Sequence, residues 1–281
     1  MTIAITTASG QLGSAVLAAV VDTVGAHNVV ALARTPEKAK GLGVEVRPGD
    51  YDDLDQLTAS LQGVDTVLLV SGISPPAERI GQHRNVIDAA VASGVRKIVF
   101  TGVQGPETGT PFSPVIHVSL ETEELVKASG LAWSIGRNGI YIEPDVEYAA
   151  TYAEHGEIAN SADDGRCAYT TRPELAAAYA ALLTSDQHDG SIVNLSGATL
   201  SQQELAERIG SVVGATLTYR AMSDAEYVAD RSAELGDFFG PIIAGIYQGI
   251  REGAYDNESD FAAVVGRPHQ SWDAYFAGVE I

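Results

Sequence analysis

The chain has few of the residues that build disulfides, metal clusters or anion-binding surfaces. Its 281 residues include a single cysteine, Cys167, so neither an internal disulfide nor a cysteine-based metal cluster can form, and we predict no metal site. Acidic residues outnumber basic ones by 37 to 17, which gives a formal net charge of −20. Nucleic acid and anionic membranes attract basic surfaces, so neither is expected as a partner.

Long apolar runs are also missing. No stretch reaches the length of a membrane span, and no basic segment precedes an apolar one at the N-terminus. These two absences predict a cytoplasmic protein with no membrane partner. The chain is long enough for one large domain or for a core with a smaller lobe, and its apolar content of 45% is typical of globular proteins.

The first half of the chain alternates short apolar runs with helical segments. Runs that are apolar on both faces and joined by helices are typical of a parallel sheet covered on both sides, so we predict an α/β fold. The predicted strands are residues 3–5, 28–33, 44–47, 65–70, 96–101 and 132–136, and the predicted helices are residues 15–21, 52–61, 77–93 and 119–129.

Beyond residue 140 the pattern is less regular and no clean domain boundary is visible. We predict a nucleotide-binding core over residues 1–140 and, over 141–281, mainly a substrate lobe with some segments returning to the core. Such a lobe is expected at the carboxyl edge of the sheet, where ligands bind in open α/β folds. The predicted elements are helices 143–155, 171–183 and 205–213, the last after a capping box at Ser201 and Glu204, and strands 191–195 and 217–220.

A glycine-containing turn directly follows the first predicted strand and opens the first helix. Its glycines let backbone amides approach a pyrophosphate closely, and the helix N-terminus adds favourable partial charge. Such a turn alone is weak evidence, but its place after a first strand makes a dinucleotide site our prediction. The first glycine of the usual G-x-x-G-x-x-G spacing is absent. The residues expected at the cofactor are Thr7, Ala8, Ser9, Gly10, Gln11, Leu12 and Gly13.

The end of the second strand indicates which dinucleotide binds. A site selective for NAD usually places an acid there, to accept from the ribose hydroxyls. Here Arg34 ends the strand, Lys38 lies one helical turn further, and the first acid is Glu37. A guanidinium can pair bidentately with a 2′-phosphate, which favours NADP. The alternative is a solvated arginine that only caps the strand.

Several catalytic motifs are absent. No Tyr-x-x-x-Lys occurs, so alcohol–ketone interconversion through a lysine-activated tyrosine is not expected. The sequence also lacks the His-Glu-x-x-His spacing of zinc hydrolases and the Gly-x-Ser-x-Gly elbow of serine hydrolases.

Eight segments carry a family likeness through their order and spacing: residues 5–13, 33–39, 49–51, 82–90, 116–123, 137–141, 170–176 and 266–268. In these segments the chain resembles the NmrA-like group of atypical short-chain dehydrogenases. Within that group it is most similar to bacterial NADPH-dependent quinone oxidoreductases and triphenylmethane dye reductases. The resemblance extends over nearly the whole chain.

The resemblance implies a Rossmann-type, doubly wound core that holds NADPH and a smaller α/β C-terminal lobe that shapes a substrate cleft. It places Gly10 to Gly13 at the pyrophosphate and Arg34 at the 2′-phosphate. Thr7 stands where the family has glycine, which we expect to weaken cofactor binding without abolishing it. Further cofactor contacts are implied at Asp50, Tyr51, Ser71, Gly72, Thr101, Gly102 and Asn138.

The implied activity is hydride transfer from NAD(P)H to a quinone or a similar electron-poor aromatic molecule. Such an acceptor is already electrophilic, so positioning supplies most of the catalysis. His117 is a candidate proton donor, expected just before a helix near the mouth of the site, or else a loop or capping residue. Tyr141 is a candidate for stacking on or hydrogen-bonding the substrate, or else a core tyrosine.

A second hypothesis comes from another functional class. Some NmrA-like proteins bind NAD(P) without turning it over and report the redox state to a partner. The missing catalytic tyrosine and the altered Thr7 keep such a sensor open for this chain. A homodimer also stays open.

Overall fold

The computed structural model describes residues 1–280, and its centre is a seven-stranded sheet in which every neighbouring pair is parallel. The strand order is β10-β6-β5-β4-β1-β2-β3. From β1, the strands β2 and β3 are added on one side, and β4, β5, β6 and β10 on the other. Such a switch point, here between β1 and β4, leaves a crevice at the carboxyl ends of the strands. The strands are β1 (Ile3–Ile5), β2 (Val29–Ala33), β3 (Glu45–Pro48), β4 (Thr66–Val70), β5 (Lys97–Val103), β6 (Ala132–Asn138) and β10 (Ser191–Leu195).

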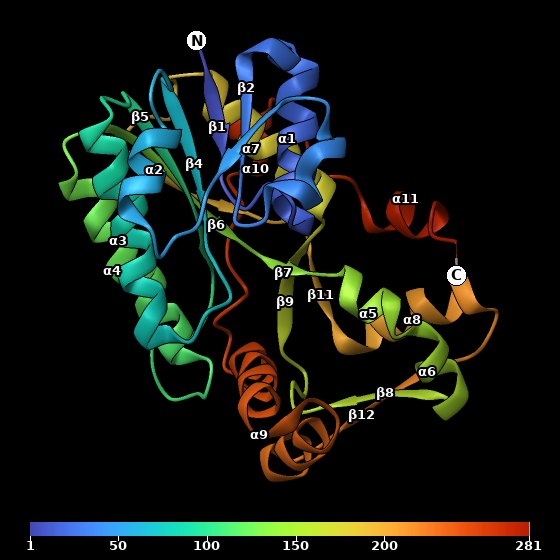
Figure 1. The fold of residues 1–281 in the computed structure, drawn as a ribbon. Coiled ribbons are helices and arrows are strands. Elements are labelled where there is room, and N and C mark those ends of the chain that lie inside the picture. Colours follow the sequence, from blue (N-terminus) through green and yellow to red (C-terminus); the bar gives the residue numbers. More distant parts are fainter. Residues whose placement is uncertain (281) are drawn as a thin grey trace.

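Helices cover both faces of this sheet (Figure 1). One face packs against α1 (Gln11–Val24), α7 (Arg172–Thr184) and α10 (Phe261–Val265), and the other against α2 (Leu54–Ser60), α3 (Pro76–Ala92) and α4 (Ser113–Ala128). Each face has its own cluster of buried apolar side chains. The predicted doubly wound α/β fold is confirmed. Two short 3-10 helices, η1 (Ala26–Asn28) and η2 (Pro36–Leu42), flank β2.

The remaining elements form a smaller lobe with a third apolar core (Figure 1). It contains a three-stranded sheet in the order β11-β9-β7 and a parallel pair, β8 and β12. The strands are β7 (Ile140–Tyr141), β8 (Glu157–Asn160), β9 (Arg166–Thr170), β11 (Thr199–Ser201) and β12 (Thr218–Ala221). The helices are α5 (Glu143–Glu147), α6 (Ala149–His155), α8 (Gln202–Val213), α9 (Asp224–Arg251) and α11 (Trp272–Ala277).

Three elements from the second half of the chain belong to the core: β10 joins the central sheet, and α7 and α10 cover it. A boundary at residue 140 stays a prediction. The longest helix, α9, is broken at Gly236, whose φ of +81° is open to glycine without strain. Neither α9 nor any other helix within residues 1–280 has the length and apolar character that a bilayer crossing requires.

The helix starts that were predicted from capping residues agree with the structure. The Thr171 hydroxyl accepts a hydrogen bond from the Glu174 amide at 3.2 Å, and Ser201 and Glu204 form the predicted capping box. Two predicted helices differ from the structure. The helix predicted to begin at residue 119 begins at Ser113, because Pro114 occupies its first turn, where a missing N–H costs nothing. The predicted helix over 143–155 is two helices, separated at Tyr148.

Candidate active site

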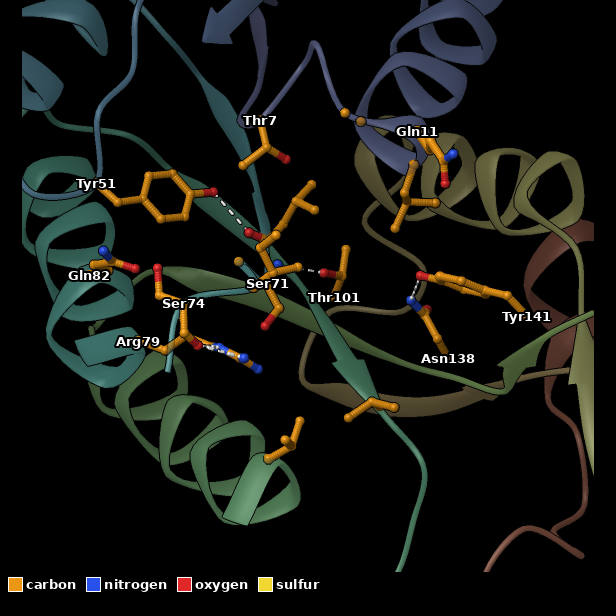
Figure 2. Close-up of a pocket in the computed structure, with 18 of the residues that line it drawn as sticks. Thr7, Gln11, Tyr51, Ser71, Ser74, Arg79, Gln82, Thr101, Asn138 and Tyr141 are labelled. Atoms are coloured by element: carbon orange, nitrogen blue, oxygen red, sulfur yellow. Dashed lines mark hydrogen bonds between the residues drawn. The ribbon is translucent and has the colours of Figure 1, made fainter. Parts of the chain in front are cut away.

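A cleft of about 770 Å³ opens at the carboxyl ends of the central strands, between the core and the smaller lobe. Turns after β1, β2, β3 and β4 form much of its wall, and Tyr51 and Tyr141 lie on opposite sides of it (Figure 2). The structure thus brings together side chains from distant parts of the sequence. The predicted site residues that line it are Thr7, Ser9, Gly10, Gln11, Leu12, Gly13, Arg34, Lys38, Asp50, Tyr51, Ser71, Gly72, Thr101, Gly102, Asn138 and Tyr141.

Two predicted site residues do not line this cleft. Ala8 is fully buried beneath the glycine turn, and its amide donates to the Leu32 carbonyl at 3.0 Å, which ties the turn to β2. The sequence predicts His117 just before a helix. In the structure it lies within α4, and its side chain is exposed. The expected position was wrong because the helix begins at Ser113. From this place His117 does not face the cleft, and we assign it no proton transfer.

The glycine turn is built for close backbone approach. The Gly10 amide donates to the Thr7 carbonyl at 2.8 Å, which closes the turn. A Cβ at Gly13 would lie 2.9 Å from the Thr7 carbonyl carbon and nearer still to its oxygen, so only glycine fits there. The cradle therefore suits a pyrophosphate held by main-chain amides at the N-terminus of α1.

Thr7 has an unusual backbone conformation for its residue type. Its φ is +46°, in the left-handed region where a β-branched side chain is strained. A glycine at this position would adopt the same φ freely. Thr7 thus keeps the shape of the turn at a cost in stability.

We expect Thr7→Gly to raise the free energy of unfolding by about 1 kcal/mol, because relief of about 1–2 kcal/mol of left-handed strain exceeds the extra chain entropy of glycine. NADPH should also bind a few-fold more tightly to the relaxed turn. Urea unfolding and a fluorescence titration measure the two effects. Thr7→Ala keeps a Cβ at the same φ and should show no comparable gain in stability; an equal gain would contradict the strain.

Two exposed cations face the cleft beside this turn. Arg34 follows β2, and Lys38 lies in η2. Within residues 1–280 neither side chain forms a salt bridge, whereas other arginines do, such as Arg137 with Glu123 at 2.8 Å. In a chain of net charge −20, two cations without carboxylate partners at one cleft edge leave room for an anionic group. A 2′-phosphate fits this requirement.

The wall below the turn is held by buried hydrogen bonds. The Tyr51 hydroxyl bonds the Thr6 hydroxyl and, at 2.9 Å, the Val70 carbonyl (Figure 2). Burial raises the pKa of Tyr51. The Ser71 amide donates to the Thr101 hydroxyl at 2.9 Å. These bonds connect the ends of β1, β4 and β5, so the Tyr51 hydroxyl supports the wall rather than facing a ligand.

His83, which the sequence did not mark as part of the site, supports the next residue of the wall. The Gly72 amide approaches its Nε2 at 3.4 Å, and its Nδ1 lies 2.8 Å from the Thr122 hydroxyl. Burial lowers the pKa of His83 to about 3, so the ring is neutral and Nε2 can accept. Its signal in the sequence, a histidine on an apolar helix face, does not distinguish this from ordinary packing.

The part of the cleft lining that comes from the start of α4 and from β7, α5, α7 and α9 is called the acceptor end here. It consists of Phe112, which caps α4, and of Val115, Ile140, Tyr141, Pro144, Arg172 and Ile246. The Arg172 guanidinium lies 5.5 Å from the centre of the Tyr141 ring and 3.9 Å from carboxylate oxygens of both Glu143 and Glu147. Its charge is therefore balanced locally. Sequence reasoning missed most of these residues, since they come from separate elements and carry no common motif.

Arg79, also missed, is held differently. Its guanidinium donates twice to the Ser74 carbonyl, at 2.6 and 2.9 Å, and so fixes the loop after β4 (Figure 2). Burial lowers the pKa of Arg79, but an arginine stays charged at neutral pH.

Tyr141 is hydrogen-bonded and half-buried. The Asn138 side-chain amide donates to the Tyr141 oxygen at 3.0 Å (Figure 2). Burial raises the pKa of Tyr141 to about 12, so its phenol keeps its proton at neutral pH. The hydroxyl thus combines an occupied acceptor position with a proton that it can still donate.

Comparison with known proteins identifies the family. A family model described as NAD(P)H-binding matches residues 7–186. Quinone oxidoreductase 2 of Escherichia coli (strain K12) is 36% identical over 272 residues, which cover 95% of this chain and 94% of that protein. The chain belongs to the NAD(P)H-binding family. The resemblance inferred from the eight segments is confirmed.

Two solved structures place this NAD(P)H-binding chain among reductases over its full length. An Escherichia coli NADPH-dependent quinone oxidoreductase in complex with NADPH has a TM-score of 0.91 and 33% identity, covering 98% of this chain and 99% of the other. The Citrobacter sp. triphenylmethane reductase in complex with NADP(H) has a TM-score of 0.91 and 31% identity, covering 99% and 100%. These comparisons and the cations at the cleft edge support NADP(H) as the cofactor.

Proposed function

We propose that this protein is an NADPH-dependent reductase that transfers a hydride to a quinone or to a similar planar, electron-poor aromatic molecule. The observation that carries the proposal is a single cleft that joins a glycine turn with free cations to an aromatic and apolar acceptor end. The full-length likeness to proteins named as quinone oxidoreductase and triphenylmethane reductase supports it. The same likeness favours a reductase over the non-catalytic sensor.

Bound NADPH would supply the hydride, and the chain's own residues bind and orient both molecules. Main-chain amides in the first turn of α1, up to Gly13, would hold the pyrophosphate, and Arg34 with Lys38 would hold the 2′-phosphate. Asp50 and Tyr51, which line the cleft, would border the adenine. Ser71, Gly72, Thr101, Gly102 and Asn138, which also line it, would border the ribose and nicotinamide.

At the acceptor end, the apolar side chains of Phe112, Val115 and Ile246 line the cleft and would shield a bound flat ring from water. Because Arg172 is balanced by its glutamates, the site suits a neutral molecule. The Tyr141 O–H points its proton toward the carbonyl oxygen on which negative charge develops as the hydride arrives. Solvent then protonates the oxyanion, and the quinone leaves as a hydroquinone. No lysine-activated tyrosine is needed, since the acceptor is electrophilic from the start.

The first test is NADPH oxidation with 1,4-naphthoquinone, followed at the nicotinamide absorbance. We expect steady turnover by the wild-type protein. Tyr141→Phe should lower kcat about tenfold, the upper range for a neutral hydrogen bond, and leave the Kd for NADPH unchanged. No NADPH oxidation above background with a panel of quinones would overturn the proposal.

His117→Ala is the matched control for this experiment, because His117 is exposed on α4 and does not line the cleft. Its kcat should equal that of the wild type. A fall in kcat comparable to that of Tyr141→Phe would show that His117 takes part in the reaction after all.

A further inference from the structure

A buried tyrosine lies behind the residue that holds Tyr141. Tyr179, on α7, is fully buried, and its hydroxyl oxygen lies 2.6 Å from Asn138 Oδ1 and 3.0 Å from the Gly136 carbonyl oxygen. A Cβ at Gly136 would come within 2.6 Å of that hydroxyl, so the strand leaves space for it by having glycine there. Tyr179 does not line the cleft and can act on a ligand only through Asn138.

The hydroxyl decides which way the Asn138 amide faces. A phenol carries one proton, and two acceptors lie within its reach: the Asn138 amide oxygen at 2.6 Å and the Gly136 carbonyl oxygen at 3.0 Å. The shorter contact receives the proton, which holds the amide oxygen toward Tyr179. The amide nitrogen then faces Tyr141 and donates to its oxygen at 3.0 Å. With that oxygen already accepting, the Tyr141 proton has no partner on Asn138 and is free to point into the cleft.

We propose that Tyr179 is a positioning residue for carbonyl acceptors, an inference that rests on the proposed function. By orienting the Asn138 amide, it makes Tyr141 a donor toward the substrate. Without the Tyr179 hydroxyl the amide loses this preference. It can then rotate so that its oxygen accepts from Tyr141, which draws the phenolic proton away from the cleft. A substrate carbonyl would lose its hydrogen bond although Tyr141 itself is unchanged.

The test compares Tyr179→Phe with Tyr219→Phe. Tyr219 is the matched control because its hydroxyl also contacts an asparagine, Asn160, at 3.0 and 3.1 Å, but in the smaller lobe and away from the cleft. The first readout is the Kd of 1,4-naphthoquinone for protein loaded with NADP⁺, where no hydride donor is present. We expect Tyr179→Phe to raise this Kd about three- to tenfold, the effect of one neutral hydrogen bond, and Tyr219→Phe to leave it unchanged.

The second readout is a double-mutant cycle. If Tyr179 acts only through Tyr141, the variant carrying both Tyr141→Phe and Tyr179→Phe should bind and reduce the quinone no more weakly than Tyr141→Phe alone. Additive losses, or a Tyr179→Phe protein with wild-type quinone affinity, would overturn the inference. A wild-type protein that reduces no quinone would instead overturn the proposed function.

Asn138→Asp supplies an independent variant in case Tyr179→Phe does not fold. Both oxygens of an aspartate accept hydrogen bonds, so Tyr141 would donate to it in either orientation while Tyr179 stays intact. The Kd of 1,4-naphthoquinone should again rise about three- to tenfold, the cost of one lost hydrogen bond. An unchanged Kd in this variant would contradict the proton direction that we infer.

Discussion

Gly13→Ala is expected to weaken NADPH binding about 100-fold, because overpacking costs about 1–3 kcal/mol or more and here the whole cost falls on the binding turn. The added Cβ would meet the Thr7 carbonyl group and, at 3.2 Å, the Ala8 Cα. All of these are backbone atoms, so no side-chain rotation relieves the overlap. The turn has to move away from the shape that presents its amides. A fluorescence titration with NADPH measures the loss.

The control is Gly81→Ala, on the exposed face of α3. A Cβ at Gly81 has no neighbour within 4 Å, and alanine favours a helix by about 0.5–1 kcal/mol over glycine. This variant should be slightly more stable than the wild type and bind NADPH equally well. Wild-type affinity in Gly13→Ala would show that the turn does not hold the cofactor, and the enzymatic proposal would fall with it.

Arg34→Ala is expected to raise the Kd for NADPH about 10- to 100-fold, since a charge-assisted hydrogen-bonded contact contributes about 1.5–3 kcal/mol. The Kd for NADH, which lacks the 2′-phosphate, should change little. The ratio of the two dissociation constants is therefore the informative quantity. Equal losses for both nucleotides would show that Arg34 stabilises the turn in general and does not recognise the phosphate.

Lys40→Ala distinguishes direct contact of Arg34 with the 2′-phosphate from the general electrostatic field of the protein. Lys40 lies in η2 beside Lys38 and is exposed, but it does not line the cleft. Removing its charge should change the Kd for NADPH far less than Arg34→Ala does. The difference between the two variants should be largest at high ionic strength, where distant charges are screened. If Lys40→Ala lost as much NADPH affinity as Arg34→Ala, the preference for NADPH would come from the net charge near the cleft and not from direct contact.

The sequence was informative wherever a function depends on neighbours along the chain. Gly10 and Gly13 lie in the turn and first helical residues after β1, and Arg34 directly follows β2. In a parallel sheet all strand ends of one kind meet at one edge. Local order therefore placed them correctly at the cleft. The caps at Thr171 and Ser201 were predictable for the same reason, since a cap and its helix are adjacent in sequence.

The acceptor end was much less predictable. Ile246 reaches it from α9, and Phe112 reaches it because α4 begins earlier than the proline-containing loop suggested. His117 was misplaced by the same shift of the helix start. Packing between the smaller lobe and the core brings these residues together, and no spacing along the chain encodes that arrangement.

From its residues alone, the chain determined an α/β fold, and it predicted a dinucleotide turn and an arginine for a phosphate, because strand periodicity, glycine and charge act over a few neighbouring positions. The tertiary structure alone decided that Tyr179 stands behind Asn138, and that α4, α7 and α9 enclose one acceptor end. Those relations depend on burial and on contacts between residues far apart in sequence, which exist only once the lobe has closed onto the sheet.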